Sequence, residues 1–337
     1  MSGARIELSH GGGGRAMQQL IAEVFALAFA HAGTKQGNDQ AEFLLGAGRH
    51  AFSTDSYVIS PLFFPGGDIG SLAVHGTVND LAMGGAVPLY LSAGFIIEEG
   101  FPIADLKRIA ASMGRAAREA GVAIVTGDTK VVERGKGDGV FINTAGIGRV
   151  PEGVDLSGDR AQPGDAILLS GSIGDHGIAI MASRSGLRFD TTIESDSAAL
   201  HTLVAAMLAA APGALRLLRD PTRGGLAATL NEIAAQSGVG MRLDEAAIPI
   251  KPQVRGACEL LGLDPLNVAN EGKLIAVCDP AAADAVVAAM RTHRLGREAA
   301  RIGFVTADPQ RFVEMHTSFG GRRMVDWLHG EQLPRIC

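Results

Sequence analysis

GGDIGSLAVHGTVNDLAMGGAVPLYLSAGFII, residues 66–97, is the stretch that best predicts the fold of the first half of the chain. Asp68 to Gly84 reads as a helix, entered through Pro65-Gly66-Gly67 and left through Gly84-Gly85. Leu89 to Ile97 follows as a strand candidate. A helix that leads directly into a strand predicts a mixed fold.

The same reading extends in both directions and favours an α+β class, because helices and strands mix without strict βαβ alternation. Helices are expected at Met17–His31, Ile103–Ala120, Ala198–Ala210, Leu226–Gln236, Gln253–Leu261 and Ala281–Arg294, with another opening at Gly174-Asp175-His176-Gly177. Strands are expected at Tyr57–Ser60, Val122–Thr126, Val140–Ile147, Ala166–Ser170, Lys273–Val277, Ala300–Val305 and Phe312–Met315.

Two domains are expected from the length, with a polar linker at Pro151–Pro163 and a loop at Gly33–Gln40. The boundaries fall at 1–150 and 151–327, and residues 328–337 form a tail without periodicity.

Composition excludes several classes of protein. A net charge of −6 argues against a nucleic-acid partner, and one Trp with two Tyr leaves few stacking platforms for bases. Glycine is 45 of 337 residues, which suggests tight turns and close approach of backbone to a ligand.

Location is predicted from cysteine usage and hydropathy. Cys258, Cys278 and Cys337 are too few for a disulfide framework, the start has no signal peptide, and no apolar run is long enough for a membrane span. A soluble, cytoplasmic and reduced protein is therefore expected.

Three aspartates lie beside predicted strands or near the end of a predicted helix. Asp55 precedes a strand, Asp80 lies late in the helix of residues 68–84, and Asp128 follows a strand. Such carboxylates can converge on Mg²⁺ and leave coordination sites for phosphate oxygens. Ordinary turn and capping roles are the alternative.

Other candidates also have a plain structural alternative. Gly12 and Gly13, in a run of four glycines before a helix, suit phosphate or form a flexible linker. Lys130 could hold a phosphate or lie on the surface, and Asp220 lies in an anion site or a capped helix start. Glu271 could be a general base, although a turn role fits its neighbours better. The glycine run at residues 11–14 is neither a Walker nor a Rossmann motif.

Histidine and cysteine give fewer options. His75 lacks ligands at metal spacing, and His176 has no matched nucleophile, so neither a zinc site nor a triad is supported. Cys258 and Cys278 lie in apolar segments and read as packed thiols. Cys337 ends a polar tail with no evident packing role, so it reads as an accessible thiol able to carry an acyl or carbamoyl group, or as a chance terminal residue.

Long motifs in order resemble the HypE family of hydrogenase expression/formation proteins along nearly the whole chain. They are LSHGGGG (8–14) with Met17, FFPGGDIG (63–70), the run from His75 to Phe101, TGDTKVV (126–132), FINTAGIG (141–148), GDHG (174–177), RDPTRGGLA (219–227), ANEGK (269–273) and PRIC (334–337). The resemblance implies a two-domain fold shared with aminoimidazole ribonucleotide synthetase, selenophosphate synthetase and thiamine-monophosphate kinase, and a homodimer built through the N-terminal sheets.

The resemblance also implies an activity. A carbamoyltransferase, HypF, loads a carbamoyl group on Cys337, ATP drives its dehydration to a thiocyanate, and the cyanide passes to iron on a HypC–HypD scaffold for [NiFe]-hydrogenase. Asp55, Asp80 and Asp128 would surround Mg²⁺ and ATP, and Lys130 and Glu271 would flank the thiocarboxamide. Gly12, Gly13 and Asp220 are weaker assignments to the ATP site.

Two other functions compete with this expectation. A kinase or synthetase of the same superfamily would act on a free small molecule and would not need the tail thiol. A carrier gated by ATP would only bind partners, without hydrolysis coupled to a carbamoylated tail.

Overall fold

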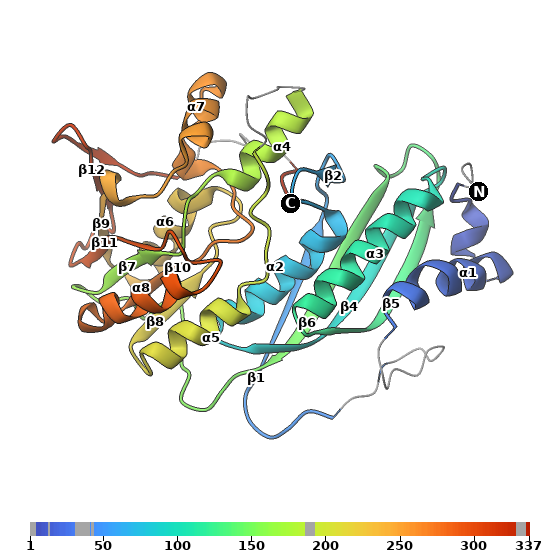
Figure 1. Cartoon of the computed structure of the whole chain (residues 1–337), viewed down its shortest axis with the longest axis horizontal. Coiled ribbons are helices and arrows are strands. Elements are labelled where there is room, and N and C mark those ends of the chain that lie inside the picture. Colours follow the sequence, from blue (N-terminus) through green and yellow to red (C-terminus); the bar gives the residue numbers. More distant parts are fainter. Residues whose placement is uncertain (1–4, 13, 31–40, 42–43, 186–192, 328–334) are drawn as a thin grey trace.

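The structure is a computed structural model that describes residues 5–12, 14–30, 41, 44–185, 193–327 and 335–337. Within these ranges the chain forms two halves, each built of helices on a sheet (Figure 1). The α+β class expected from the sequence is confirmed. The expected loop at 33–40 and the tail residues 328–334 lie outside the described residues.

The first half is a four-stranded sheet in the order β1-β6-β4-β5. Its strands are β1 (His50–Tyr57), β6 (Val140–Arg149), β4 (Val87–Glu98) and β5 (Ala123–Val132). β4 and β5 are parallel, and α3 (Ile103–Glu119) connects them, as a parallel pair requires a crossover. β1 and β5 are thus the outer strands of the sheet.

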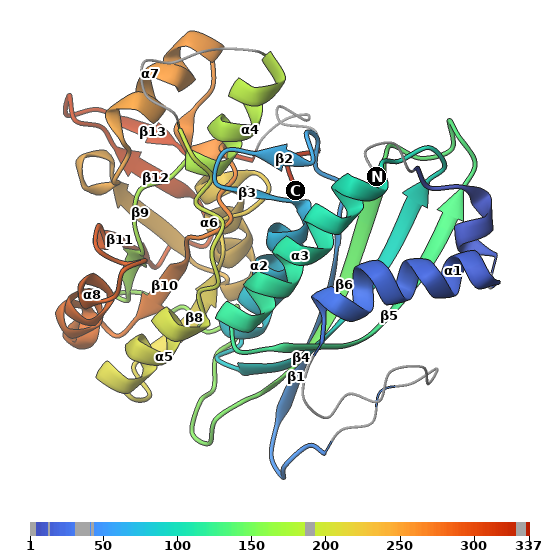
Figure 2. The ribbon, with the colours of Figure 1, turned by 45° about the vertical axis from the view of Figure 1, so that its right-hand side comes forward.

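Helices cover one face of this sheet (Figure 2). They are α1 (Arg15–Leu20), which continues as a π-helical turn at Ile21–Ala26, α2 (Ile69–Met83) and α3. Their apolar side chains share one core with the strands. The opposite face leaves Phe52 and Ile96 exposed by 70% and 47%.

Helix α2 joins the two halves. Asp68 caps its first turn, accepting hydrogen bonds from the N–H groups of Gly70 and Ser71. Most of its residues are buried, because it also contacts α5 (His201–Ala210) and β8 (Leu215–Arg219) of the second half. A helix buried on nearly all sides has no polar face, which explains its apolar sequence.

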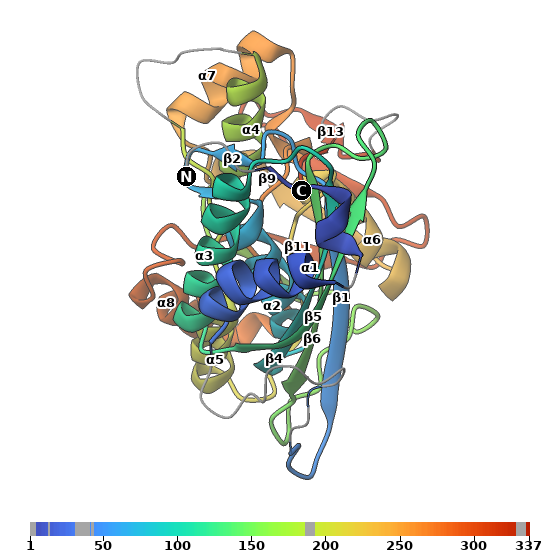
Figure 3. The ribbon, with the colours of Figure 1, turned by 90° about the vertical axis from the view of Figure 1, so that its right-hand side faces the viewer.

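The second half is a mixed seven-stranded sheet in the order β13-β12-β9-β11-β7-β10-β8, with helices on both faces (Figure 3). Besides β8, the strands are β13 (Arg322–Met324), β12 (Val313–His316), β9 (Gly240–Asp244), β11 (Ala300–Thr306), β7 (Ala166–Leu169) and β10 (Ile275–Cys278). Besides α5, the helices are α4 (Asp175–Ser185), α6 (Gly225–Ser237), α7 (Pro252–Leu261) and α8 (Ala283–Thr292), and a short hairpin of β2 (Phe63–Phe64) and β3 (Gly67–Asp68) precedes α2.

Some predicted elements differ from the structure. The strand expected at residues 57–60 is wrong, since β1 ends at Tyr57 and begins at His50. Asp55 therefore lies inside a strand rather than before one, and Asp128 lies inside β5 because that strand runs to Val132, beyond its predicted end at Thr126. Strands β2, β3, β8, β9 and β13 were not predicted. Among the described helices, none is long and apolar enough to cross a membrane.

Candidate active site at the end of the chain

The last three residues lie where the two halves meet, beside β2 (Figure 1). The main-chain oxygens of Cys337 and Arg335 accept hydrogen bonds from Val58 N and Ser60 N, at 3.0 and 3.3 Å. Arg335 Nε donates to the Val58 carbonyl at 2.8 Å. These bonds place the terminal residues next to the segment that follows β1.

The terminal residues are packed, contrary to expectation. Ile336 is 2% exposed, and Cys337 is half-buried against the core of the first half. Burial raises the pKa of the Cys337 thiol, as do Glu271 and Asp55, whereas Arg223 lowers it. The prediction that Cys337 is an accessible thiol without a packing role is therefore wrong for this structure, because the main chain of residues 335–337 is hydrogen-bonded to the segment after β1. Cys258 and Cys278 are buried, as expected.

Glu271 is a buried carboxyl group near this thiol. It is 3% exposed, and its Oε1 has no hydrogen-bond partner among the described residues. Burial, together with Asp220 and Asp196, raises the pKa of Glu271 well above its ordinary value. A carboxyl group with a raised pKa suits general acid–base work near neutral pH.

The main chain of Glu271 is held on both sides. Asp196 accepts hydrogen bonds from Glu271 N at 3.1 Å and Gly272 N at 3.2 Å. Lys273 forms an ion pair with Asp196, at 3.0 Å. Asn79 of α2 donates to the Glu271 carbonyl at 3.3 Å. Asp196 could not be predicted as part of the site, because it lies in a segment without a motif.

Two further carboxyl groups belong to the same region. Asp80 of α2 accepts a hydrogen bond from Ser53 of β1 at 2.6 Å. Burial raises the pKa of Asp80, and burial together with Asp80 raises the pKa of Asp220 to about 7. Asp55 adds negative charge that raises both values. Carboxyl groups crowded in a poorly hydrated place favour a cation among them.

A pocket of about 420 Å³ opens beside these carboxyl groups. It is lined by Asp80, Met83, Arg219, Asp220, Thr222, Arg223, Thr229 and Glu232. Arg223 and the nearby start of α6 offer positive charge to an anion, whereas Arg219 forms an ion pair with Glu232 of the same pocket. The anion site predicted around Asp220 therefore has both a pocket and cationic side chains.

Asp128 and Lys130 lie elsewhere, on β5. Lys130 Nζ contacts Asp128 Oδ2 at 2.6 Å, and this hydrogen bond lowers the pKa of Asp128. Asp128 pairs with Gly94, which pairs with the exposed Asn143, so its side chain is on the open face of the sheet. β5 and β1 are separated by three strand spacings, roughly 14 Å at about 4.8 Å each.

Asp55 lies on the other face of the same sheet. It pairs with Thr144, which is buried and donates a hydrogen bond to Ala73 of α2. One chain therefore does not bring Asp55, Asp80 and Asp128 together, and among the described residues no three acidic, His or Cys side chains are close enough to share a metal ion. Lys130 and Glu271 of one chain are likewise apart.

The glycine run lies on the side of Asp128 and Lys130. Gly11 ends a 3₁₀ turn (Leu8–Gly11) that contacts β5, and a Cβ there would lie 2.9 Å from Val131. Gly12 follows directly, whereas Gly13 lies outside the described residues. The candidates thus divide into a set around Cys337 and a set on β5.

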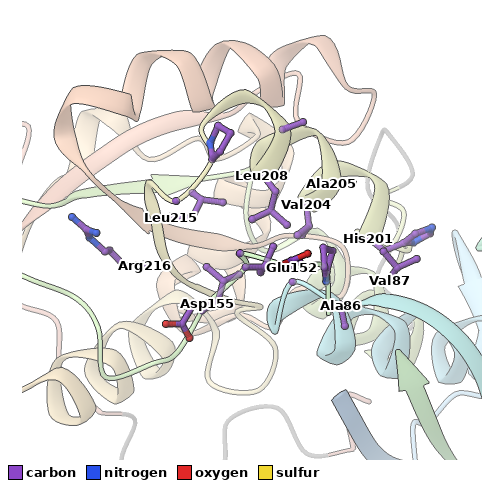
Figure 4. Close-up of a pocket in the computed structure, with 18 of the residues that line it drawn as sticks. Ala86, Val87, Glu152, Asp155, His201, Val204, Ala205, Leu208, Leu215 and Arg216 are labelled. Carbon is purple, nitrogen blue, oxygen red and sulfur yellow. The ribbon is translucent and has the colours of Figure 1, made fainter. Parts of the chain in front are cut away.

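A second pocket contains none of these residues. It measures about 480 Å³ and lies between the 151–156 segment, α5 and the start of β4 (Figure 4). Its floor is largely apolar, with Val87, Val204, Leu208 and Leu215. It is separate from the candidate active site.

Comparison with known proteins decides the family. Family models described as the N-terminal and C-terminal domains of AIR synthase related protein match residues 37–150 and 162–316. Carbamoyl dehydratase HypE of Rhizobium leguminosarum bv. viciae is 68% identical over 100% of this chain and 96% of that protein. The chain belongs to the HypE family of carbamoyl dehydratases. The expected family is confirmed.

Solved structures of HypE proteins have the same fold as this chain. The crystal structure of hydrogenase maturation protein HypE in complex with ATP is 53% identical, covers 98% of this chain and 99% of that one, and has a TM-score of 0.94. The HypE chain of a HypE–HypF complex is 49% identical, covers 92% of this chain and 99% of that one, and has a TM-score of 0.81.

Proposed function

We propose that this chain dehydrates an S-carbamoyl group on Cys337 to a thiocyanate, using ATP, and so supplies cyanide for the iron of [NiFe]-hydrogenase. The observation that supports this most is the seating of a terminal cysteine beside a buried Glu271 with a raised pKa. Membership of the HypE family supports the same activity.

The chemistry requires a poor leaving group to be made a good one. The carbamoyl oxygen attacks the γ-phosphorus of ATP, the bond to ADP breaks, and the carbamoyl oxygen becomes a phosphate ester. Two N–H protons must then leave as C≡N forms and phosphate departs. Glu271 takes one proton and the departing phosphate takes the other.

The two sets of residues suggest a homodimer. In it the open sheet faces of two copies, with the exposed Phe52 and Ile96, cover each other. A second copy would then bring its β5 edge, with Gly12, Asp128 and Lys130, toward the Cys337 site. Lys130 would stabilise negative charge on the transferred phosphoryl group.

Magnesium fits the donor set, because carboxylates in a crowded acidic region suit a hard cation. Asp55 and Asp80 of one copy, with Asp128 of the other, would hold it. When bound it would neutralise charge on the polyphosphate. Asp220, Arg219 and Arg223 line the pocket that we assign to the nucleotide phosphates.

The tail needs a second position for loading. A half-buried thiol with a raised pKa is a poor nucleophile and is not open to another protein. We therefore propose that residues 328–337 swing outward to receive the carbamoyl group from HypF, return for dehydration, and present the product to a HypC–HypD scaffold. We expect Gly330 to be the hinge, Leu333 and Ile336 to be apolar anchors and Pro334 to limit the conformations of the tail. Of these residues only Ile336 is among those described, and it is buried. We assign residues 1–150 to nucleotide binding and dimerisation and 151–327 to a second α+β domain, in a cytoplasmic protein.

Phosphate release tests this function against its rivals. Chain carbamoylated on Cys337 should release about one phosphate per thiol with Mg-ATP, and unloaded chain or Cys337→Ala should release little. Cys258→Ala is the matched control and should behave as the parent. Equal release by Cys337→Ala would favour a kinase or synthetase acting on a free molecule. No release from the loaded chain would favour a carrier that only binds.

A further inference from the structure

Two motifs that the proposed function leaves unused meet at the tail. GDHG contributes His176 at the start of α4, and FFPGGD contributes Phe64. His176 is 0% exposed. The rings of His176 and Phe64 pack edge to face, with their centroids 5.6 Å apart. A fully buried histidine must have both ring nitrogens hydrogen-bonded, so its partners show what it does.

Both ring nitrogens of His176 are paired. Nε2 lies 2.7 Å from the Ile336 carbonyl, and Nδ1 lies 2.8 Å from Ser195 Oγ. A carbonyl only accepts, so Nε2 holds the proton and donates it to Ile336. Nδ1 is then an acceptor, and the Ser195 hydroxyl donates to it.

Ser195 is fixed in its turn. Its hydroxyl accepts a hydrogen bond from Ser197 N at 3.1 Å, and its own N–H donates to the Pro65 carbonyl at 2.8 Å. Gly66 has a φ of +89°, and a Cβ there would lie 2.8 Å from the main-chain carbonyl oxygen of Ser195. The glycine of FFPGGD is thus needed for the loop to approach Ser195.

We propose that His176 is a positioning residue for dehydration, acting through the Ile336 carbonyl, and that Ser195 sets its tautomer. The Ile336 carbonyl belongs to the peptide unit that ends at Cys337 N. Fixing that plane holds the Cα of Cys337 in place and so limits where its sulfur can lie relative to Glu271. This inference rests on the proposed role of Cys337 as the carrier.

His176 binds the main chain of the tail and not the group carried on the Cys337 sulfur. This contact is therefore available to the bare thiol, the thiocarboxamide and the thiocyanate alike. The neighbouring Arg184 also binds main-chain oxygens, those of Ser60 and Arg335. Recognition of the backbone explains how a tail with few large side chains is seated.

The test uses the full-length chain and two readouts. The first is the rate at which a thiol reagent labels unmodified Cys337, which needs no ATP chemistry and is specific because Cys258 and Cys278 are buried. The second is the single-turnover rate of thiocyanate formation after carbamoylation. His176→Leu should speed labelling and slow turnover, each by about tenfold, the effect of one buried hydrogen bond.

Conservative and control variants separate positioning from folding. His176→Gln keeps an N–H donor and should recover much of both rates, and Ser195→Ala should shift both in the same direction as His176→Leu. His75→Leu is the matched control, because His75 Nδ1 also binds a serine of this segment, Ser197, at 2.9 Å but makes no hydrogen bond to the described tail residues 335–337. It should leave Cys337 labelling unchanged.

Three results would overturn the proposal: unchanged labelling in His176→Leu and Ser195→Ala, faster labelling with unchanged turnover, or equally fast labelling in His75→Leu. A parent chain that fails to dehydrate its carbamoyl group would instead refute the proposed function. The labelling rates would still decide whether His176 seats the tail.

Discussion

At the scale of single residues, the site is a set of carboxyl groups whose charge the fold disfavours. Burial raises the pKa of Glu271, Asp80 and Asp220. Nothing in a chain's own stability requires acidic side chains in such a place, so their presence points to a ligand or a proton transfer.

Glu271→Gln should leave ATP binding intact and stall the reaction with the thiocarboxamide still on Cys337. The variant keeps the shape of the side chain and removes the base, which costs about 10²–10⁴ in rate. Single-turnover mass analysis of the carbamoylated chain measures this. Turnover within a few-fold of the parent would exclude Glu271 from the mechanism.

Asp80→Asn should weaken Mg-ATP binding about tenfold or more, the loss of a charged contact. Its thermal midpoint should stay the same or rise, because the ionised form is disfavoured in the folded chain and the amide can still accept from Ser53. Calorimetry and thermal unfolding give the two quantities. Asp128→Asn should also weaken binding, and unchanged nucleotide affinity in both variants would remove the metal assignment.

At the scale of elements, α2 shows what a pattern can and cannot predict. Its glycine entry, its exit at Gly84-Gly85 and its length were all predictable, because capping and breaking residues act locally. That α2 is shared by both halves was not, since contacts of Asn79 with residues around 198 and 271 depend on the tertiary fold.

Strands β1 and β5, whose bounds were predicted only in part, have polar sequences for a physical reason. Ser53 and Asp55 point toward the helix-covered face, where Ser53 binds Asp80, so β1 lacks an apolar face. β5 reads as a turn through Gly127 and Asp128, because its open face is polar in the single chain. At the site, the terminal position of Cys337 already indicated a carrier thiol, and the resemblance favoured a base over a turn role for Glu271. His176 and Asp196 act through hydrogen bonds that no spacing indicates.

Helix α2 also predicts a pH dependence of stability. Burial lowers the pKa of His75 to about 4, below its unfolded value of about 6.5. The unfolded chain therefore binds more protons between these values, so stability falls as the pH drops from about 6.5 to about 4, by up to about 3 kcal/mol. Urea unfolding at several pH values should show that the free energy of unfolding of His75→Gln depends less steeply on pH between about 4 and 6.5 than that of the parent. An identical slope in this window would contradict the assignment.

At the scale of the whole molecule, the separation of β5 from the Cys337 site is the reason for proposing a site shared between two copies. We expect Lys130→Ala and Glu271→Gln each to be inactive alone. When the two are co-expressed, random pairing makes about half of the dimers mixed, and each mixed dimer has one intact site, so activity should recover to about a quarter of the parent.

The recovered activity should be confined to one chain. In a mixed dimer the intact site uses Glu271 and Cys337 of the Lys130→Ala chain, so only that chain should gain thiocyanate. Mixing Lys130→Ala with Asp128→Asn is the control and should recover nothing, because both changes lie on the same edge. No recovery in the first mixture would place Lys130 outside a shared site.

The most direct measurement of the central claim is the intact mass of the full-length chain after incubation with HypF, carbamoyl phosphate and Mg-ATP. We predict the gain of one carbamoyl group on Cys337, followed by the loss of one water that requires ATP, with neither step in Cys337→Ala. A carbamoyl group that stays hydrated with ATP present, or a thiocyanate that forms on Cys258 or Cys278, would contradict the account.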